Sequence, residues 1–147
     1  MNSSVWRPVQ HIRPISIALI QRGSEILVMT VRDDQGKLKG YRPPGGGIDF
    51  GETAVDAVKR EFMEELGFAI TIIDLHCVLE NIYSHENALG HEIVFVHKAN
   101  FIDASVLQRD NFSFTDAGVD IQCLWIPIAD FTSGAVTIYP AGLANKL

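Results

Sequence analysis

Three glutamates carry most of the chemistry that the sequence offers: Glu61, Glu64 and Glu65, in the run Glu-Phe-Met-Glu-Glu-Leu-Gly. On a helix, at about 100° per residue, they share one face, where like charges three and four residues apart repel. Arg60 alone cannot neutralise all three. Hard divalent cations such as Mg²⁺ bind carboxylates and often share their remaining coordination sites with substrate phosphates. A solvated acidic face is the plainer explanation of a charge run, so the surrounding residues must decide.

The surrounding residues match a longer pattern, G-x5-E-x7-R-E-U-x-E-E-x-G-U, in which U is a bulky apolar residue. The fixed positions are Gly46, Glu52, Arg60, Glu61, Glu64, Glu65 and Gly67, and the two U positions are Phe62 and Phe68. This pattern resembles the Nudix box of the Nudix hydrolase superfamily, where an aliphatic residue is more usual at the position of Phe62. A match at this many fixed positions is far more specific than a lone glycine motif.

The resemblance implies an α/β protein with the Nudix fold: an α/β/α sandwich with a mixed β-sheet and a loop-helix-loop catalytic motif. Weaker likenesses flank the box, and they are Arg13-Pro14, Pro44 to Gly47, and Leu124 to Ile128. Together they predict that residues 1–147 form a single Nudix hydrolase domain.

The resemblance also implies the chemistry. Nudix enzymes use Mg²⁺ or Mn²⁺ to hydrolyse a nucleoside diphosphate linked to another moiety, by attack of water on phosphorus. By position, Glu64 and Glu65 would be metal ligands together with the backbone carbonyl of Gly46, and Glu61 would bind a metal or accept the proton of the attacking water. The remaining polar pair of the motif, Glu52 and Arg60, would support catalysis by orienting the loop and the helix.

Candidates outside the box are less specific. Asp116 and Asp120 precede a predicted strand and are assigned to the substrate side of the site, where either could also act as an additional ligand or base; Glu92 ranks behind them. Tyr83 follows another predicted strand and could stack on a base, although partly buried packing is an equal alternative.

The substrate stays open at this stage. A proline downstream of the box is associated with ADP-ribose hydrolysis in this superfamily, and no proline lies between Pro44 and Pro127. Nucleoside triphosphates, oxidised nucleotides, dinucleoside polyphosphates and nucleotide sugars remain. The alternative function is a non-catalytic Nudix-like nucleotide-binding or sensor domain, and a Nudix-fold isoprenoid diphosphate isomerase is a second rival.

The predicted elements place the box on one helix. Thr53 to Leu66 has helical spacing, with Thr53 as N-cap and Gly67 as the terminating residue. Arg32–Gly40 is predicted as a surface loop, and Pro43 to Gly47 as a loop of unusual backbone path. The predicted strands are Ile15–Ile20 and Glu25–Val31, which form a hairpin, then Ala69–Ile73, Cys77–Tyr83, His91–Phe101 and Val119–Ile128.

Composition bounds the remaining possibilities. The chain has 147 residues, 47% of them hydrophobic, and a formal net charge of −6. We expect one domain with a hydrophobic core. We expect neither a nucleic-acid partner nor a membrane segment. An acidic protein repels phosphates unless bound cations reverse the local charge, which agrees with metal dependence. The two cysteines are expected to be reduced, the location cytoplasmic, and the assembly a homodimer.

Overall fold

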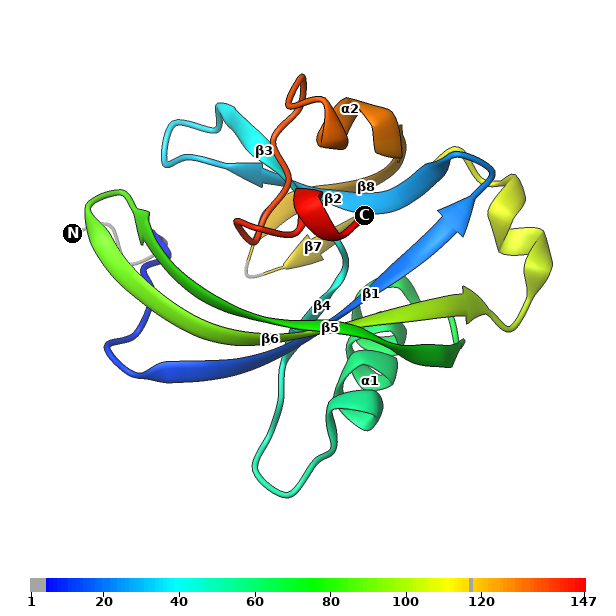
Figure 1. The fold of residues 1–147 in the computed structure, drawn as a ribbon, viewed down its shortest axis with the longest axis horizontal. Helices are drawn as coiled ribbons and strands as arrows, with labels where there is room; N and C mark the ends of the chain where they lie inside the picture. Colours follow the sequence, from blue (N-terminus) through cyan, green and yellow to red (C-terminus); the bar gives the residue numbers. More distant parts are fainter. Residues whose placement is uncertain (1–4, 117) are drawn as a thin grey trace.

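The protein is described here by a computed structural model that covers residues 5–116 and 118–147. Within these residues eight strands form one sheet, with α1 and α2 on either side of it (Figure 1). The elements in chain order are β1 (Ile12–Arg22), β2 (Glu25–Arg32), β3 (Leu38–Arg42), β4 (Gly45–Gly47), α1 (Ala54–Leu66), β5 (Ile70–His85), β6 (Ala88–Phe101), η1 (Ala104–Gln108), β7 (Asn111–Asp116), β8 (Val119–Pro127), α2 (Ile128–Thr132) and η2 (Ala144–Lys146).

The sheet is mixed, as predicted. Its strand order is β5-β6-β1-β2-β8-β7, with β4 paired to β1 and β3 paired to β2. β1 and β6 run parallel, and the other paired strands run antiparallel. The predicted hairpin is the β1–β2 pair. β5 and β6 form a long curved hairpin that extends beyond the centre of the sheet (Figure 1).

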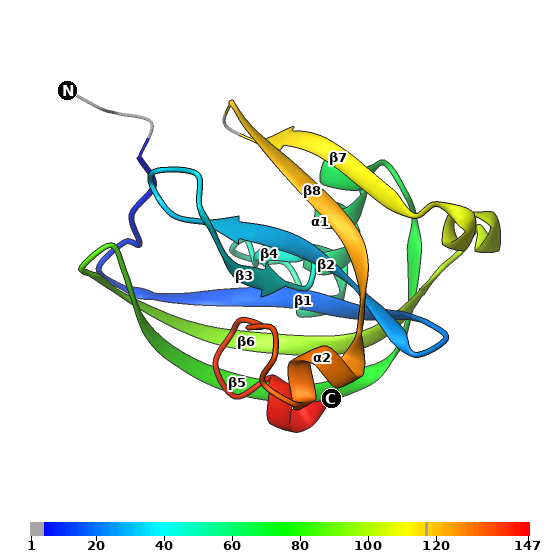
Figure 2. The same cartoon turned by 90° about the horizontal axis from the view of Figure 1, so that it is seen from above.

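Two apolar clusters lie on opposite faces of the sheet. One contains Val58 and Phe62 of α1, and the other contains Phe131 of α2 and Leu143 near the C-terminus. Figure 2 shows α2 and the C-terminal segment in front of the strands and α1 behind them. The α/β/α arrangement is therefore confirmed, and the face that carries α1 also carries the box carboxylates.

Two segments predicted as loops contain strands. β3 begins at Leu38, inside the predicted loop Arg32–Gly40, and β4 takes up Gly45–Gly47 of the predicted glycine loop. These predictions were wrong because both segments gain their order from backbone pairing. β4 has no side chains with which to show a strand pattern, yet its residues pair with Ile15 to Ile17 of β1.

The predicted strands Ala69–Ile73 and Cys77–Tyr83 are one strand, β5, whose register against β6 shifts twice, between Ile72 and Asp74 and between Leu75 and Cys77. These irregularities break the alternation of side chains, so the sequence resembles two strands. The segment Ile102–Gly118 also holds η1 and β7, neither of which was predicted. Among the described residues, no helix has the length and apolar character needed to cross a membrane.

Candidate active site

The helix α1 begins and ends where the sequence predicts. The Thr53 side chain accepts a hydrogen bond from the backbone N–H of Asp56 at 3.1 Å, and Gly67 ends the helix at a φ of +77°. Val58 and Phe62 are buried against the sheet. Because these apolar residues fix the rotation of the helix, Glu61 and Glu65 are turned toward the neighbouring β4 and the cavity beside it.

Glu61 lies directly against Gly46 of β4. A Cβ atom on Gly46 would come within 2.4 Å of the Glu61 side-chain Cδ, so a larger residue here would displace the Glu61 carboxylate. This close approach brings a backbone segment and a carboxylate of the predicted metal site together. The glycine of the box at this position leaves the carboxylate where it is.

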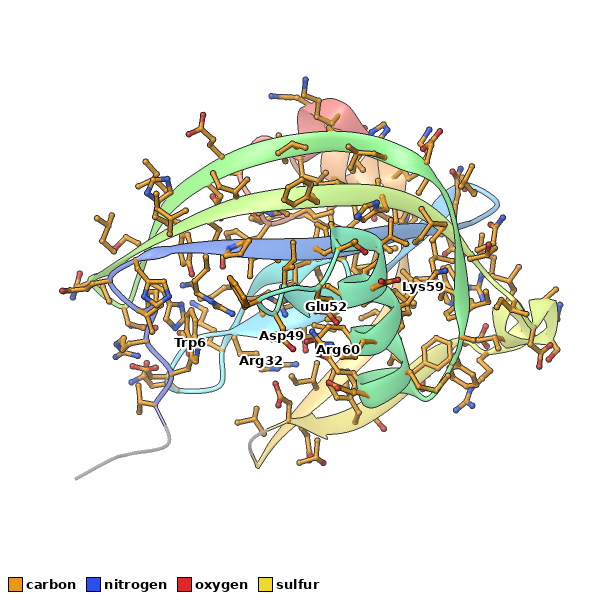
Figure 3. The ribbon with its side chains drawn as sticks, turned by 90° about the horizontal axis from the view of Figure 1, so that it is seen from below. Trp6, Arg32, Asp49, Glu52, Lys59 and Arg60 are labelled. Atoms are coloured by element: carbon orange, nitrogen blue, oxygen red, sulfur yellow. The ribbon has the colours of Figure 1, made fainter. Side chains whose placement is uncertain are left out.

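Arg60 joins the loop to the helix (Figure 3). Its Nε and Nη2 donate to the two carboxylate oxygens of Glu52 at 2.8 and 3.0 Å, and Nη2 also donates to the Gly47 carbonyl at 3.0 Å. Its Nη1 donates to Glu61 at 3.0 Å and to Glu64 at 3.3 Å. One planar guanidinium therefore holds β4, the following loop and two box carboxylates in a fixed arrangement.

The ion pair at the base of this arrangement is strongly favoured in its charged form. The hydrogen bond from Arg60, followed by the one from the backbone N–H of Asp49, lowers the pKa of the Glu52 carboxyl to about 2. Glu52 in turn raises the pKa of Arg60. Glu52 and Arg60 thus stay ionised over the whole physiological range, which suits groups that orient others and do not exchange protons.

The pKa of Glu65 is shifted in the opposite direction to that of Glu52. Burial, then the neighbouring Glu61 carboxylate and the charge of Asp116, together raise the pKa of the Glu65 carboxyl to about 8, while Arg42 opposes the shift. If the Glu61 and Glu65 carboxyl groups were both ionised, they would have more negative charge than their surroundings balance. A hard divalent cation would relieve this repulsion, so the residues present fit Mg²⁺ or Mn²⁺.

A cavity of about 1170 Å³ opens beside these groups. Glu61, Glu64, Glu65 and Gly46 line one end of it, which we call the carboxylate end. Asp116 and Asp120 also line the cavity, and both are exposed. Asp120 accepts a hydrogen bond from Thr115 at 3.1 Å. Of the predicted substrate-side acids, Asp116 is the one whose charge acts on Glu65.

Tyr83 lines the same cavity, on the wall that β5 and β6 form. A Cβ atom on Gly90, its cross-strand partner, would come within 2.3 Å of the Tyr83 ring, so the ring lies directly against the glycine. Its hydroxyl donates to Glu92 at 3.5 Å, and burial followed by the Glu92 charge raises the pKa of Tyr83 to about 12. Packing against Gly90 thus fixes the ring. Because the ring also lines the cavity, its role in substrate binding stays a prediction.

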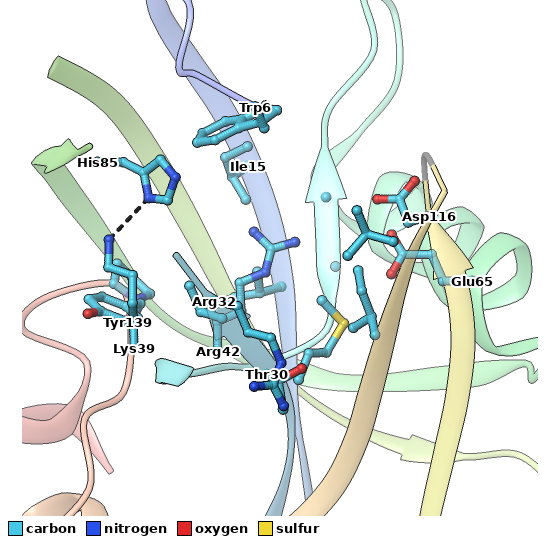
Figure 4. Close-up of a pocket in the computed structure, with 18 of the residues that line it drawn as sticks. Trp6, Ile15, Thr30, Arg32, Lys39, Arg42, Glu65, His85, Asp116 and Tyr139 are labelled. Atoms are coloured by element: carbon cyan, nitrogen blue, oxygen red, sulfur yellow. Dashed lines mark hydrogen bonds between the residues drawn. The ribbon is translucent and has the colours of Figure 1, made fainter. Parts of the chain in front are cut away.

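The other end of the cavity was missed by sequence reasoning. Arg32, Lys39 and Arg42 of the β2–β3 hairpin line it, together with Trp6 and His85, and we call this the cationic end (Figure 4). The Trp6 and His85 rings meet edge to face at 5.4 Å between centroids, and Lys39 Nζ lies 3.1 Å from His85 Nδ1. These residues come from separate elements, so no local motif could have revealed them.

A second group of potential metal ligands lies near this end. Oxygen and nitrogen atoms of Asp34, His85 and Glu86 lie within 4.8 Å of one another. Arg7, however, donates to both carboxylate oxygens of Asp34, at 3.1 and 2.7 Å, and Lys39 faces His85. Because cationic side chains already contact two of the three groups, this cluster is a poorer cation site than the carboxylate end.

The NUDIX domain family matches residues 10–141. Among solved structures, a MutT NUDIX hydrolase from Burkholderia pseudomallei is similar, with 24% identity, a TM-score of 0.62, and coverage of 82% of this chain and 86% of that one. A NUDIX hydrolase from Nitrosomonas europaea has 17% identity, a TM-score of 0.63, and coverage of 92% and 85%.

A third similar structure is an ADP-ribose pyrophosphatase from Streptococcus suis, with 16% identity, a TM-score of 0.54, and coverage of 80% of this chain and 75% of that one. At these identities the structures show the fold alone. The family match spans most of the chain and includes the whole box, so the chain belongs to the Nudix superfamily. It is an enzyme of the Nudix hydrolase type, in the class of pyrophosphohydrolases.

Proposed function

We propose that the protein hydrolyses a phosphoanhydride bond of a nucleoside diphosphate linked to another moiety, with Mg²⁺ or Mn²⁺ bound at the carboxylate end. The observation that carries this proposal is the group of Glu61, Glu64 and Glu65 beside Gly46, at one end of a cavity of about 1170 Å³. That volume slightly exceeds the roughly 300–1,000 Å³ that small-molecule sites commonly enclose, so the cavity has room for a nucleotide.

The bound metal would offset the charge of the diphosphate and lower the pKa of a water molecule. Glu64, Glu65 and the Gly46 carbonyl are the groups assigned to hold it. Glu61 either joins them or accepts the proton of the attacking water, and its place against Gly46 allows both roles. Arg60, anchored on Glu52, keeps Glu61 and Glu64 oriented during the reaction.

The nucleoside end of the substrate is assigned to the far side of the cavity. The exposed Trp6 ring offers an apolar face next to His85, and such faces stack on any nucleobase. Tyr83, Asp116 and Asp120 remain substrate-side candidates along the walls between the two ends. Nucleoside triphosphates, oxidised nucleotides, dinucleoside polyphosphates and nucleotide sugars are the candidate substrates.

The alternative of a non-catalytic nucleotide-binding or sensor domain is disfavoured by the complete set of box residues. A sensor needs affinity only, whereas Glu61, Glu64 and Glu65 together provide the charge that metal-assisted hydrolysis requires. Metal-dependent turnover of any nucleotide in a panel would decide for the enzyme. Tight nucleotide binding without turnover would decide for the sensor.

Location, domain organisation and assembly are also proposals. Both cysteines are free thiols, which supports a reducing, cytoplasmic environment, and we take the chain to act as one Nudix domain. We also propose a homodimer, because dimers are the commonest soluble oligomers and because apolar side chains such as Ile82 and Leu89 are exposed. Light scattering that gives the 16.3 kDa mass of one chain across micromolar concentrations would contradict the dimer.

The reaction itself is tested by hydrolysis in ¹⁸O-labelled water. The label is expected in a nucleoside monophosphate or a shorter nucleotide, or in the fragment released with it, because the scissile bond lies inside the phosphate chain. EDTA should abolish turnover, since the acidic site cannot attract the anion unaided. Turnover that persists in EDTA, or activity confined to simple phosphate monoesters, would overturn the proposal.

A further inference from the structure

The cavity has two ends of opposite charge, and the assignment of metal and diphosphate uses only one of them. The carboxylate end lies against α1, whereas Arg32, Lys39 and Arg42 project from β2 and β3 (Figure 4). A protein with a formal net charge of −6 has gathered three cationic side chains in one cavity wall. The metal and the diphosphate therefore leave these three cationic side chains without an assigned role.

The three cations are not equally engaged. Arg32 donates to the Gly36 carbonyl at 3.0 Å, which stabilises the hairpin turn, and Lys39 contacts the His85 imidazole at 3.1 Å. Within residues 5–116 and 118–147, the Arg42 side chain makes no hydrogen bond or ion pair, although it is partly buried. A guanidinium so placed has its donors available for a ligand.

Within the cationic end, Arg42 lies on the side nearer to Glu65 (Figure 4). Its charge acts on Glu65 and on Tyr83, yet no ion pair within 4.0 Å joins it to a carboxylate among the described residues. Burial and the neighbouring Lys39 lower the pKa of His85, so at neutral pH its ring stays uncharged and Lys39 Nζ donates to it. Lys39 retains further donors directed away from His85.

The nearby acids do not cancel these cations. Asp34 is held by Arg7 on both oxygens, and Asp33 accepts backbone N–H groups of the hairpin turn, from Gln35 at 2.9 Å and from Lys37 at 2.8 Å. Both carboxylates therefore stabilise the local fold. Arg42 and Lys39 are left facing the cavity, where planar guanidinium donors suit a phosphate group.

We propose that Arg42, supported by Lys39 and Arg32, binds an anionic group of the substrate beyond the diphosphate held at the carboxylate end. The substrate class is then a nucleotide with three or more phosphates, in preference to a nucleoside diphosphate joined to a neutral sugar. This inference rests on the proposed function, because it takes the carboxylate end as the place of the scissile diphosphate.

The test measures binding and does not depend on turnover. A nucleoside diphosphate and the matching triphosphate, with every oxygen between phosphorus atoms replaced by a methylene group, are titrated calorimetrically in Mg²⁺. The wild-type protein should bind the triphosphate analogue at least about tenfold more tightly, and Arg42→Gln should lose about tenfold for the triphosphate and less than about twofold for the diphosphate. Thermal unfolding verifies that the variant is folded.

Lys37 provides the matched control, because it is an exposed cation on the same hairpin, outside the cavity. Lys37→Gln removes the same charge and should leave both affinities unchanged. Equal wild-type affinities for the two analogues, or an equal loss in Lys37→Gln and Arg42→Gln, would overturn the inference. So would an Arg42→Gln variant that loses Mg²⁺ affinity but keeps its preference for the triphosphate.

Kinetics separates this inference from the proposed function. A nucleoside triphosphate should have a kcat/KM at least about tenfold above that of the sugar-linked diphosphate of the same nucleoside, and Arg42→Gln should remove most of that difference. If no nucleotide is hydrolysed while the calorimetric preference persists, the proposed hydrolysis fails and the anion-binding role of Arg42 stands.

Discussion

The carboxylate end and the cationic end of the cavity are built in opposite ways. Every residue of the carboxylate end lies between Gly46 and Glu65, on β4 and one helix, and a single arginine fixes their positions. The cationic end draws Trp6 from the N-terminal segment, Arg32 and Arg42 from the β2–β3 hairpin, and His85 from the end of β5. One end is local in sequence, and the other exists only in the fold.

The contrast also concerns rigidity. Around Arg60, five hydrogen bonds join three carboxylates and a backbone carbonyl. At the cationic end, Trp6 is 51% exposed and Arg42 has its donors facing the cavity. A reaction centre must hold its groups in place, whereas a binding wall that accepts variable substrates need not. We therefore expect substitutions at the carboxylate end to change kcat, and substitutions at the cationic end to change KM.

The largest effect is expected for Glu65→Gln, which removes a charged ligand but keeps the shape of the side chain. Activity should fall at least about a hundredfold, because stabilisation of the transition state by the metal is lost. Glu64→Gln should behave in the same way. The measurement is kcat at saturating Mg²⁺, with Glu80→Gln on β5 as a control of the same chemistry. Near-normal turnover of both box variants would remove the assigned metal site.

A smaller loss is expected for Arg60→Lys, which keeps the charge but not the planar fork. A lysine ammonium cannot join Glu52, the Gly47 carbonyl and Glu61 at once, so Mg²⁺ affinity and activity should fall by about 10- to 100-fold. A titration of activity against Mg²⁺ measures this loss. Lys59→Gln, on the exposed side of α1, should leave the titration unchanged. An unchanged titration for Arg60→Lys would mean that Arg60 does not position the ligands.

The same contrast explains what the sequence could predict. The helix α1 was predicted with its caps because Thr53 and Gly67 act on adjacent backbone groups. The Glu52–Arg60 pair follows from a motif spacing of eight residues. Trp6 and His85 are separated by most of the sheet along the chain, so their contact depends on how β5 and the N-terminal segment meet in space.

The sequence also failed to predict strands that are stabilised mainly by backbone pairing with a neighbour. β4 consists only of glycines, and its pairing with β1 decides where Gly46 lies. β5 contains two register shifts that hide its length, and that length carries Tyr83 and His85 to the cavity. In both elements, the information lies in the partner strand and not in the residues of the segment itself.

A third prediction concerns pH and the carboxylate end alone. Without metal, Glu65 has a pKa of about 8, raised from an ordinary value of 4.5, so at neutral pH a proton competes with the cation. Mg²⁺ affinity should rise by up to about tenfold from pH 6.5 to pH 7.5, and binding should release protons. Calorimetry in two buffers of different ionisation enthalpy measures both effects.

The same shift has a consequence for folding. Because the folded state binds this proton more tightly than the unfolded state does, the metal-free protein should lose stability as the pH rises from about 4.5 to about 8. Glu65→Gln should abolish this dependence and the associated proton release. If the wild-type protein and the variant show the same pH dependence of Mg²⁺ binding and of unfolding, Glu65 is not the titrating group.

The smallest effect is expected at the cationic end, for Trp6→Ala. Stacking of an aromatic side chain on a base contributes about 1–3 kcal/mol, and the low end applies because Trp6 is 51% exposed. KM should rise about fivefold, while kcat and Mg²⁺ affinity stay at the wild-type level. Trp6→Phe keeps a stacking face and should recover most of the loss. A fall in kcat with unchanged KM would mean that Trp6 takes part in the reaction, which contradicts the division between the two ends. Equal KM values for both variants and the wild type would mean that the nucleobase binds elsewhere in the cavity.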